Sequence, residues 1–559
     1  MLAKRGWLLL FLGIVGFYLW GLGLLPLVGP DEPRYAEVAR EMLARNDLIT
    51  PTLGGIPWFE KPPLLYWMMM AGYRLLGVTE YAARLGPAVC GLLTAVFIYW
   101  IGKTFEKSSD TAEAALVENS EQSRYDLGRF SALIWLSSLG AIAFSHGASF
   151  DIVVTMTVTG ALACLLVWHV RSAQGPGKDA GEPPARMPAL LIGFYLFIGL
   201  SLLAKGLIGI VIPFGVIAAY LLIRREWPNK SFVKSLFWGG PLALAVAAVW
   251  FGPMLSRHGW KFIDQFIIQH HFARFVTNKY HHPAPFYFYL LVLAALSLPW
   301  TIFLGAAFCR RWRWRGGVGL DRFRVFVLCW IVVPMVFFSF SESKLTAYIL
   351  PVLPAVALLV GERVTYFVVA RRGDLALRLT GLLLIGLAAA GEWYLLRHSL
   401  ISSAVVVLAA SPLMVVGAIG VLRPRLRQAL FILIPLAMFA TSAISLRCVA
   451  PVIARPESVR DLLATASARG YSTVPVVELH TVERTAEFYA ADRMVYGADG
   501  EPLKFEGVAQ VAAAARHSGG PVLCLVPREY ETQLTSYPSI QTEVIANNGR
   551  VSLVAVRLK

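Results

Sequence analysis

Two acidic residues stand where the first long apolar segment of the chain ends. Asp31 and Glu32 lie between Pro30 and Pro33. Because proline fixes its own φ and disfavours helix at the residue before it, we expect Asp31 on a defined turn. A carboxylate held in this way can act as a general base or bind a cation. The alternative is that both residues only cap the helix that follows and gain from its dipole.

A second charged cluster follows in the same loop. Glu60 and Lys61 precede a pair of prolines and an aromatic, apolar run that ends at Trp67. This segment is suited to hold an isoprenoid chain while the Lys61 ammonium contacts a phosphate. The aromatic residues also fit the ordinary aromatic belt of a membrane interface, and the two interpretations are compatible. Between the clusters, Tyr35, Val38 and Met42 recur at helical spacing, which predicts an amphipathic helix on the membrane surface.

Three further charged residues interrupt apolar stretches. Asp151 lies in a short turn, where a carboxylate is costly unless it is hydrated or paired, and a solvated turn residue is the simpler interpretation. Lys205 interrupts the apolar stretch from 189 to 223; it is either a second phosphate contact or a side chain that snorkels to the membrane surface. Lys344 and Tyr348 are four residues apart and could share a helical face.

Histidines gather in the segment 256–285. His270 and His271 are adjacent, and clustered imidazoles can bind zinc, with Glu60 as a further candidate ligand. Their spacing matches no closed zinc motif, so a divalent metal stays an open alternative and we expect no required cofactor. Arg274 in the same segment is better suited to a phosphate, because its planar guanidinium matches phosphate oxygens.

The composition places these clusters in a membrane protein. Hydrophobic residues make up 57% of the 559-residue chain and charged residues only 15%, against about 25% in soluble domains. The formal net charge is +16, but the basic residues lie in gaps between apolar segments and no nucleic-acid-binding motif is present. This distribution indicates membrane topology and anionic headgroups, and it argues against nucleic acid as a partner.

Thirteen apolar segments are suited to be transmembrane helices, at 6–28, 83–102, 130–149, 152–170, 188–204, 207–223, 236–255, 286–308, 325–341, 348–368, 376–396, 401–422 and 429–448. The short even-numbered gaps are basic, as at 224–234 and 310–324, which predicts that they face the cytoplasm. The polar clusters then lie on the outer face. The N-terminus is expected in the cytoplasm and the C-terminus in the periplasm.

Residues 449–559 change character. Short buried strands are predicted at 474–479 and 521–526, helices at 458–468 and 507–517, and a hairpin over 541–559. We therefore divide the chain into a transmembrane domain, 1–448, and a small soluble α/β domain, 449–559. Cys448 and Cys524 fall in the C-terminal region and could pair if it is periplasmic; two unpaired thiols are the alternative.

These motifs resemble those of the polyprenyl-phosphate-dependent GT-C glycosyltransferases, relatives of the protein O-mannosyltransferases, and most closely those of the bacterial lipid A 4-amino-4-deoxy-L-arabinose transferases. The similarity rests on 31–37 (DEPRYAE), 59–63 (FEKPP) with 66–67 (YW), Asp151, 204–206 (AKG), 343–345 (SKL), Tyr348 and 350–351 (LP). It covers the whole membrane part. It implies an α-helical polytopic GT-C fold of about thirteen transmembrane helices with outer juxtamembrane helices.

The resemblance also implies roles for individual residues. The catalytic carboxylates would be Asp31 first and Asp151 second, and Glu60 is a further candidate. Contacts to donor or acceptor phosphates would come from Arg34, Lys61 and Lys344, and Tyr348 would shape the donor pocket.

The expected reaction is the inverting transfer of a sugar, 4-amino-4-deoxy-L-arabinose, from undecaprenyl phosphate to a lipid A phosphate. It would take place on the periplasmic side of the bacterial inner membrane. The alternative acceptor is a protein or another cell-envelope glycan. A transporter or a structural protein is disfavoured, because neither internal repeats nor midplane charges are evident and the polar residues concentrate at one membrane surface.

Overall fold

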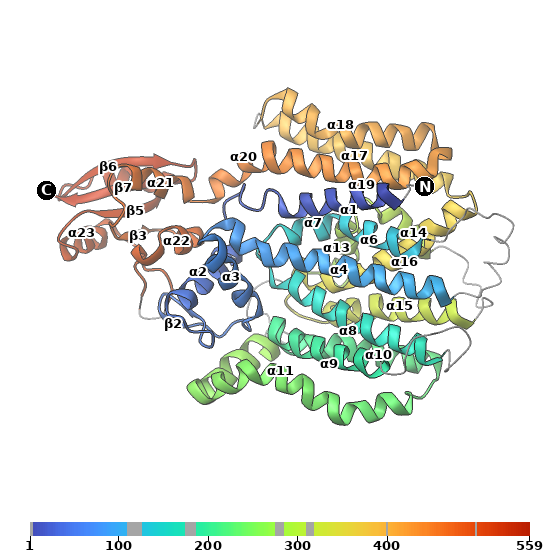
Figure 1. Cartoon of the computed structure of the whole chain (residues 1–559). Coiled ribbons are helices and arrows are strands. Elements are labelled where there is room, and N and C mark those ends of the chain that lie inside the picture. Colours follow the sequence, from blue (N-terminus) through green and yellow to red (C-terminus); the bar gives the residue numbers. More distant parts are fainter. Residues whose placement is uncertain are drawn as a thin grey trace.

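A computed structural model describes residues 4–108, 126–173, 186–273, 284–308, 318–398, 401–497 and 500–559 of the chain. Figure 1 shows a long bundle of helices that run side by side, with a small sheet domain at one end. The two termini lie at opposite ends of the molecule (Figure 1). The helical architecture and the small C-terminal α/β part predicted from the sequence are therefore confirmed.

Nine helices among the described residues are long and apolar enough to cross a membrane. They are built on α4 (Glu80–Ser108), α8 (Phe150–Ala173), α9 (Arg186–Lys205), α11 (Lys230–Phe262), α15 (Val318–Ser339), α16 (Leu353–Val369), α17 (Asp374–Arg397), α18 (Ser403–Leu422) and α19 (Arg427–Ile444). A bent pair, α6 (Leu127–Ser137) and α7 (Leu139–Ser145), makes ten if it counts as one span. Shorter apolar helices are α1 (Lys4–Leu19), α10 (Ile208–Arg224), α13 (Phe288–Leu296) and α14 (Thr301–Phe308). Each of the thirteen predicted spans overlaps these helices, but three of them are shorter or broken.

The first predicted span, 6–28, is wrong in length, because α1 ends at Leu19. Gly21 follows with a positive φ of 80°, which a glycine adopts without steric cost. The backbone carbonyls of Leu22, Leu25 and Pro26 then accept hydrogen bonds from the Arg84 guanidinium of α4, at 2.7–2.9 Å. The hydrogen bonds that a further helical turn would give to these carbonyls therefore come from the Arg84 side chain.

The predicted span 130–149 is broken between α6 and α7, which meet at 61°. Ser138 has an extended backbone at the break. Its hydroxyl donates to the Trp135 carbonyl at 2.7 Å and accepts from the Ala141 amide, so one serine ends the first helix and caps the second. The predicted span 286–308 is likewise divided, into α13 and α14.

The C-terminal part contains a five-stranded sheet in the order β4-β3-β5-β7-β6. The strands are β3 (Val476–Leu479), β4 (Lys504–Phe505), β5 (Val522–Pro527), β6 (Ile540–Asn547) and β7 (Val551–Leu558). Strands β4, β3 and β5 are parallel, and the β6–β7 hairpin joins β5 antiparallel. The main flanking helices are α21 (Arg460–Ala468), α22 (Arg484–Tyr489) and α23 (Val508–His517). The predicted strands, helices and hairpin are confirmed. Cys448 and Cys524 form no disulfide within the described residues, so the predicted alternative of two unpaired thiols holds there.

This C-terminal part packs on a juxtamembrane layer of two helices and a short hairpin. The helices are α2 (Asp31–Ala44) and α3 (Leu64–Leu76), and the hairpin pairs the two-residue strands β1 (Thr52–Leu53) and β2 (Ile56–Pro57). The Tyr489 hydroxyl accepts from the Leu27 amide at 2.8 Å and donates to Glu80 at 3.0 Å. Arg40 of α2 donates to the Phe488 carbonyl at 2.9 Å. The helix that begins at Asp31 is therefore held between the bundle and the sheet domain.

Candidate functional site

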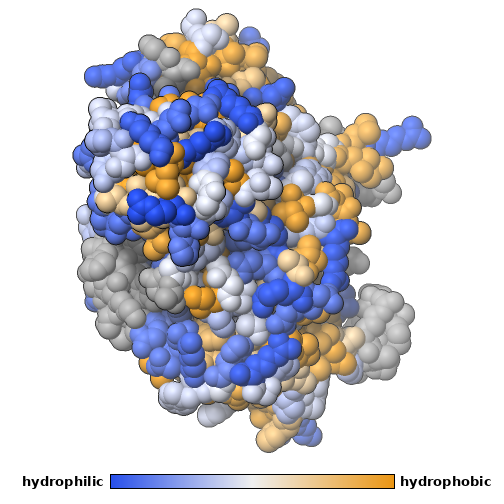
Figure 2. All heavy atoms as spheres, turned by 90° about the vertical axis from the view of Figure 1, so that its left-hand side faces the viewer, coloured by the Kyte–Doolittle hydropathy of each residue, from blue (hydrophilic) through white to orange (hydrophobic). Residues whose placement is uncertain are grey.

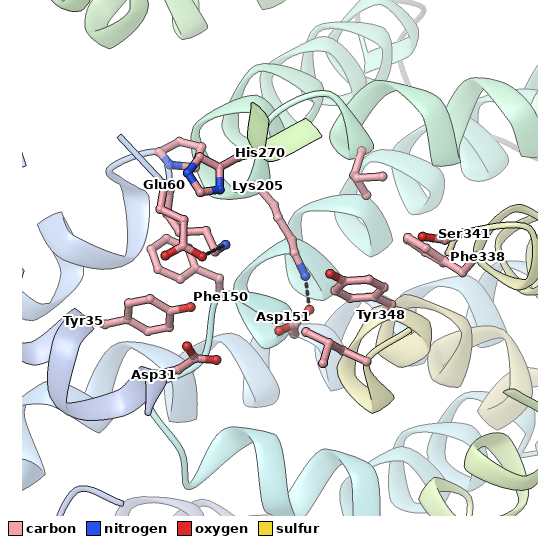
Figure 3. Close-up of a pocket in the computed structure, with 14 residues that line it drawn as sticks. Asp31, Tyr35, Glu60, Phe150, Asp151, Lys205, His270, Phe338, Ser341 and Tyr348 are labelled. Carbon is pink, nitrogen blue, oxygen red and sulfur yellow. Dashed lines mark hydrogen bonds and ion pairs between the residues drawn. The ribbon is translucent and has the colours of Figure 1, made fainter. Parts of the chain in front are cut away.

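A pocket that is open to solvent lies beside the start of α2. Its walls include seven residues that the sequence analysis singled out: Asp31, Glu60, Lys61, Asp151, Lys205, His270 and Tyr348. Figure 3 shows carboxylates, an ammonium group and aromatic rings from distant parts of the chain turned toward one space. The spacing of these residues along the sequence did not predict that their segments line one pocket.

Asp31 is the first residue of α2 and is exposed. The N-cap position is occupied by Pro30, and no side-chain hydrogen bond caps the helix there. No hydrogen bond or ion pair among the described residues uses the Asp31 carboxylate, so it is available to a substrate. Tyr35, one turn later, lines the same pocket. Burial, aided by the Glu60 and Asp31 charges, raises the pKa of Tyr35 well above its ordinary value, so its hydroxyl keeps its proton.

Glu32 faces away from the pocket and anchors the segments around it. Its carboxylate accepts from Arg84 at 2.8 and 3.0 Å, from the Val28 amide at 3.1 Å and from the Ala148 amide at 2.6 Å. Burial alone would raise the pKa of Glu32, but the Arg84 charge and these hydrogen bonds hold it below its ordinary value. Glu32 is thus an ionised anchor and not a simple helix cap.

Arg84 is the functional neighbour that the sequence analysis missed. It is 3% exposed and joins the turn after α1 to Glu32. A lone arginine near the start of an otherwise apolar span is costly in a membrane unless it is paired. That rule, applied to the predicted span 83–102, is the signal that would have found it.

Asp151 and Lys205 form an ion pair across the pocket (Figure 3). Asp151 lies in the first turn of α8, where the Ser149 hydroxyl also donates to it at 3.3 Å. Lys205 is the last residue of α9, and its ammonium lies 4.9 Å from the centre of the Tyr348 ring. Neither residue is merely solvated or merely snorkelling, because each has its partner inside the pocket.

Glu60 and Lys61 form a second ion pair, at 2.8 Å, in which each side chain is 14% exposed. His270 lies in the same pocket as Glu60 (Figure 3). No group of three His, Cys, Asp or Glu side chains that could hold a metal is found in the described part of the chain. The His271 side chain and Arg274 lie outside the described residues, so the metal site and the Arg274 contact stay predictions.

Two predicted phosphate contacts, Arg34 and Lys344, are absent from the described lining of the pocket. The Arg34 guanidinium donates to the Pro30 carbonyl at 3.0 Å and lies over the Trp58 ring. Lys344 donates to the Ser341 carbonyl at 2.7 Å. The expectation that Lys344 shares a helical face with Tyr348 is wrong, because Lys344 precedes the 3₁₀ helix η2 (Thr346–Val352). Their phosphate roles stay predictions.

The pocket combines three carboxylates with two ammonium groups at the end of the bundle that carries the juxtamembrane layer. Figure 2 faces this end and shows hydrophilic residues over much of it. Ammonium groups in a partly buried site can bind and stabilise phosphate oxygens. A carboxylate such as Asp31, which has no partner in the described part of the chain, can orient or deprotonate a nucleophile. The arrangement suits group transfer at a membrane surface.

Comparison with known proteins gives this chemistry a family context. Residues 7–314 match the family described as dolichyl-phosphate-mannose-protein mannosyltransferase. The chain is 30% identical over 419 residues to the undecaprenyl phosphate-alpha-4-amino-4-deoxy-L-arabinose arabinosyl transferase of Erwinia tasmaniensis, covering 72% of this chain and 69% of that protein. It is 31% identical over 387 residues to the enzyme of the same name from Edwardsiella ictaluri, covering 68% and 63%. The matched region is thus about two thirds of the length of these relatives.

Solved structures show the fold. The crystal structure of ArnT from Cupriavidus metallidurans bound to undecaprenyl phosphate superposes with a TM-score of 0.73 at 22% identity, over 99% of this chain and 98% of that one. The predicted GT-C fold is therefore confirmed over nearly the whole chain, including the sheet domain.

Proposed function

The chain belongs to the dolichyl-phosphate-mannose-protein mannosyltransferase family, and from this premise we propose that it transfers 4-amino-4-deoxy-L-arabinose from undecaprenyl phosphate to a lipid A phosphate. It is a multi-pass membrane glycosyltransferase. The names of its relatives support the sugar and the donor. The observation that carries the proposal is the pocket that Asp31, which has no hydrogen-bond or ion-pair partner among the described residues, shares with the ammonium groups of Lys61 and Lys205.

The donor's phosphate is the leaving group in this reaction. Cleavage at the anomeric carbon develops positive character on the sugar and negative charge on the phosphate. Lys205 and Lys61 stabilise that charge from fixed positions, which requires little reorganisation at the moment of transfer. The carboxylates of Asp151 and Glu60 keep both ammonium groups in place before the donor binds.

Asp31 acts on the acceptor. A lipid A phosphate is already an anion, so Asp31 orients it through a shared proton or a bound cation. A hydroxyl acceptor would instead need Asp31 as a general base. The donor and acceptor are held together in one site, so that attack occurs from the face opposite the leaving phosphate. No covalent intermediate forms, and the anomeric configuration inverts.

Orientation in the bilayer is part of the proposal. The pocket and the sheet domain face the periplasm, with the N-terminus in the cytoplasm. The basic gaps at 224–234 and 423–427 support this orientation through the positive-inside rule. Both substrates are lipids with phosphate heads, so their reacting groups meet at the outer membrane surface of the bundle.

Mass spectrometry of lipid A from cells with and without the gene tests this assignment. We expect the lipid A species that carries an added aminopentose to disappear on deletion and to return with the wild-type chain. Unchanged lipid A masses, together with a glycoprotein that loses its sugar, would move the assignment to a protein acceptor. The mannosyltransferase name of the family makes that acceptor the specific alternative.

A further inference from the structure

A second cavity, open to solvent, lies at the end of the bundle opposite the pocket that contains Asp31. Helix α8 connects the two sites, because Asp151 in its first turn lines the first pocket, and Trp168 and His169 near its other end line this cavity. At about 1.5 Å per residue, α8 carries the chain about 27 Å from Asp151 to His169. That distance is close to the thickness of a bilayer's hydrocarbon core, so the second cavity, here named the far cavity, lies at the other membrane surface.

Four helices, α8, α10, α11 and α15, and the loop 225–229 form the described walls of the far cavity. Figure 1 shows that these helices run along the bundle. Much of the lining is aromatic: Trp168, Tyr220, Trp227, Phe232 and Phe326. Trp227 is 94% exposed, as is typical of a tryptophan placed at the level of lipid headgroups.

The charged groups at the far cavity leave positive charge in excess when Arg224, which is paired with the lining residue Glu226, is counted with Arg322. One oxygen of Glu226 accepts from Arg224 at 3.0 Å and from Arg322 at 3.3 Å. A single carboxylate therefore serves two guanidinium groups. The Nε atoms of Arg224 and Arg322 are both buried and make no hydrogen bond within the described part of the chain. Buried charged donors without an acceptor are costly. Arg322 lines the far cavity, and Arg224 adjoins this lining through the carboxylate of Glu226.

We propose that the far cavity binds the headgroup of an anionic phospholipid from the leaflet opposite the catalytic pocket. The phosphate accepts hydrogen bonds from Arg224 and Arg322, which prefer planar contact with phosphate oxygens. An acyl chain covers the apolar walls at Ile217 and Leu221. Basic pockets between transmembrane helices on the cytoplasmic side are a known physical type of anionic-lipid site. A soluble phosphate ester would leave these apolar walls exposed, so we assign the site to the intact lipid.

Native mass spectrometry of the purified full-length chain tests the site. The chain is held in zwitterionic detergent, and phosphatidylglycerol, phosphatidylcholine or glycerol phosphate alone is titrated into separate samples. We expect phosphatidylglycerol to be retained in preference to phosphatidylcholine, and glycerol phosphate not to compete. Arg322→Gln should weaken phosphatidylglycerol binding about tenfold, the ratio expected for one charge-assisted hydrogen bond. The matched control, Arg423→Gln, removes an exposed arginine from another gap and should leave binding unchanged.

Glu226→Gln should change phosphatidylglycerol affinity in the direction opposite to Arg322→Gln, which distinguishes a direct effect on binding from loss of folding. Removing this carboxylate frees both guanidinium groups, so phosphatidylglycerol should bind more tightly, whereas general destabilisation would weaken binding. The proposal is overturned if the wild-type chain does not prefer phosphatidylglycerol, or if Arg322→Gln and Arg423→Gln behave alike. Equal competition by glycerol phosphate would also overturn it, in favour of a soluble phosphate ester.

Discussion

Arg84 and Glu32 form a buried ion pair that ties together the two segments carrying Asp31 and Asp151. Glu32 is the residue next to Asp31, and its carboxylate also accepts from the Ala148 amide, three residues before Asp151. The distance between the two catalytic candidates therefore depends on a pair that never enters the pocket. Positioning of this kind supplies much of the rate in reactions that join two bound substrates.

Glu32→Gln should destabilise the chain, because it leaves the Arg84 charge buried without its partner. Breaking a buried pair in this way costs about 3–5 kcal/mol. The pKa of Glu32 is lowered in the fold, so its stabilisation is present above the ordinary carboxyl pKa and is lost as the pH falls through the lowered value. Thermal unfolding in detergent at neutral and acidic pH measures both effects. The exposed Glu342→Gln is the control, and equal unfolding of the two variants would contradict the anchor role.

Lys61→Ala should weaken binding of undecaprenyl phosphate without loss of folding. Lys61 lines the pocket and is held by Glu60, and removing one charge-assisted contact to phosphate corresponds to about tenfold in affinity. Titration with the lipid phosphate, followed by intrinsic fluorescence, measures the change. Lys504→Ala, in the sheet domain, is the matched control. Unchanged donor affinity in Lys61→Ala would mean that this lysine serves only the membrane interface.

Glu478 should make the sheet domain less stable at high pH. Its side chain is buried in β3, and burial raises its pKa to about 8. A carboxyl whose folded pKa is raised costs stability as the pH rises from its ordinary value to the raised one, and the loss is complete above about 8. Hydrogen exchange of β3 and β5 in the whole chain should therefore be faster at pH 9 than at pH 6 after correction for intrinsic rates. Glu478→Gln should remove the difference, and a difference that persists would rule out this carboxyl as its source.

The two ends of the bundle should differ in access from outside the cell. Cysteines placed at Ser536, in the sheet domain, and at Arg423, in a basic gap, both replace exposed residues. An impermeant thiol reagent added to intact spheroplasts should label the first and spare the second, after subtraction of labelling of the parent chain. The reverse pattern would place the pocket in the cytoplasm and remove the proposed acceptor from reach.

The sequence predicts the parts of the fold that depend on local patterns. Apolar length located the membrane helices, the spacing of Tyr35, Val38 and Met42 located α2, and short apolar runs located β3 and β5. The breaks at Leu19 and Ser138 were missed, because an apolar run is equally compatible with a straight helix and with a bent one.

Seven of the predicted site residues line the pocket, but Arg34 and Lys344 are absent from its described lining, and the contacts between the lining residues were not predicted. Asp151 and Lys205 were each interpreted alone, although they form one ion pair between α8 and α9. Such pairs depend on how helices pack, which the spacing of residues along the chain does not specify. For the same reason the role of Arg84 was not predicted, because its partners lie in two other segments.

Transfer by the purified chain tests the central claim most directly. The wild-type chain, Asp31→Asn and the exposed control Glu342→Gln are incubated with undecaprenyl-phosphate-linked 4-amino-4-deoxy-L-arabinose and lipid A, and the lipid A mass is followed by mass spectrometry. The account predicts an aminopentose increment with the wild-type chain and the control. With Asp31→Asn it predicts a rate lower by about 10²-fold, because the acceptor is no longer oriented. Transfer by Asp31→Asn within a few-fold of wild type, or no increment with any chain, would contradict it.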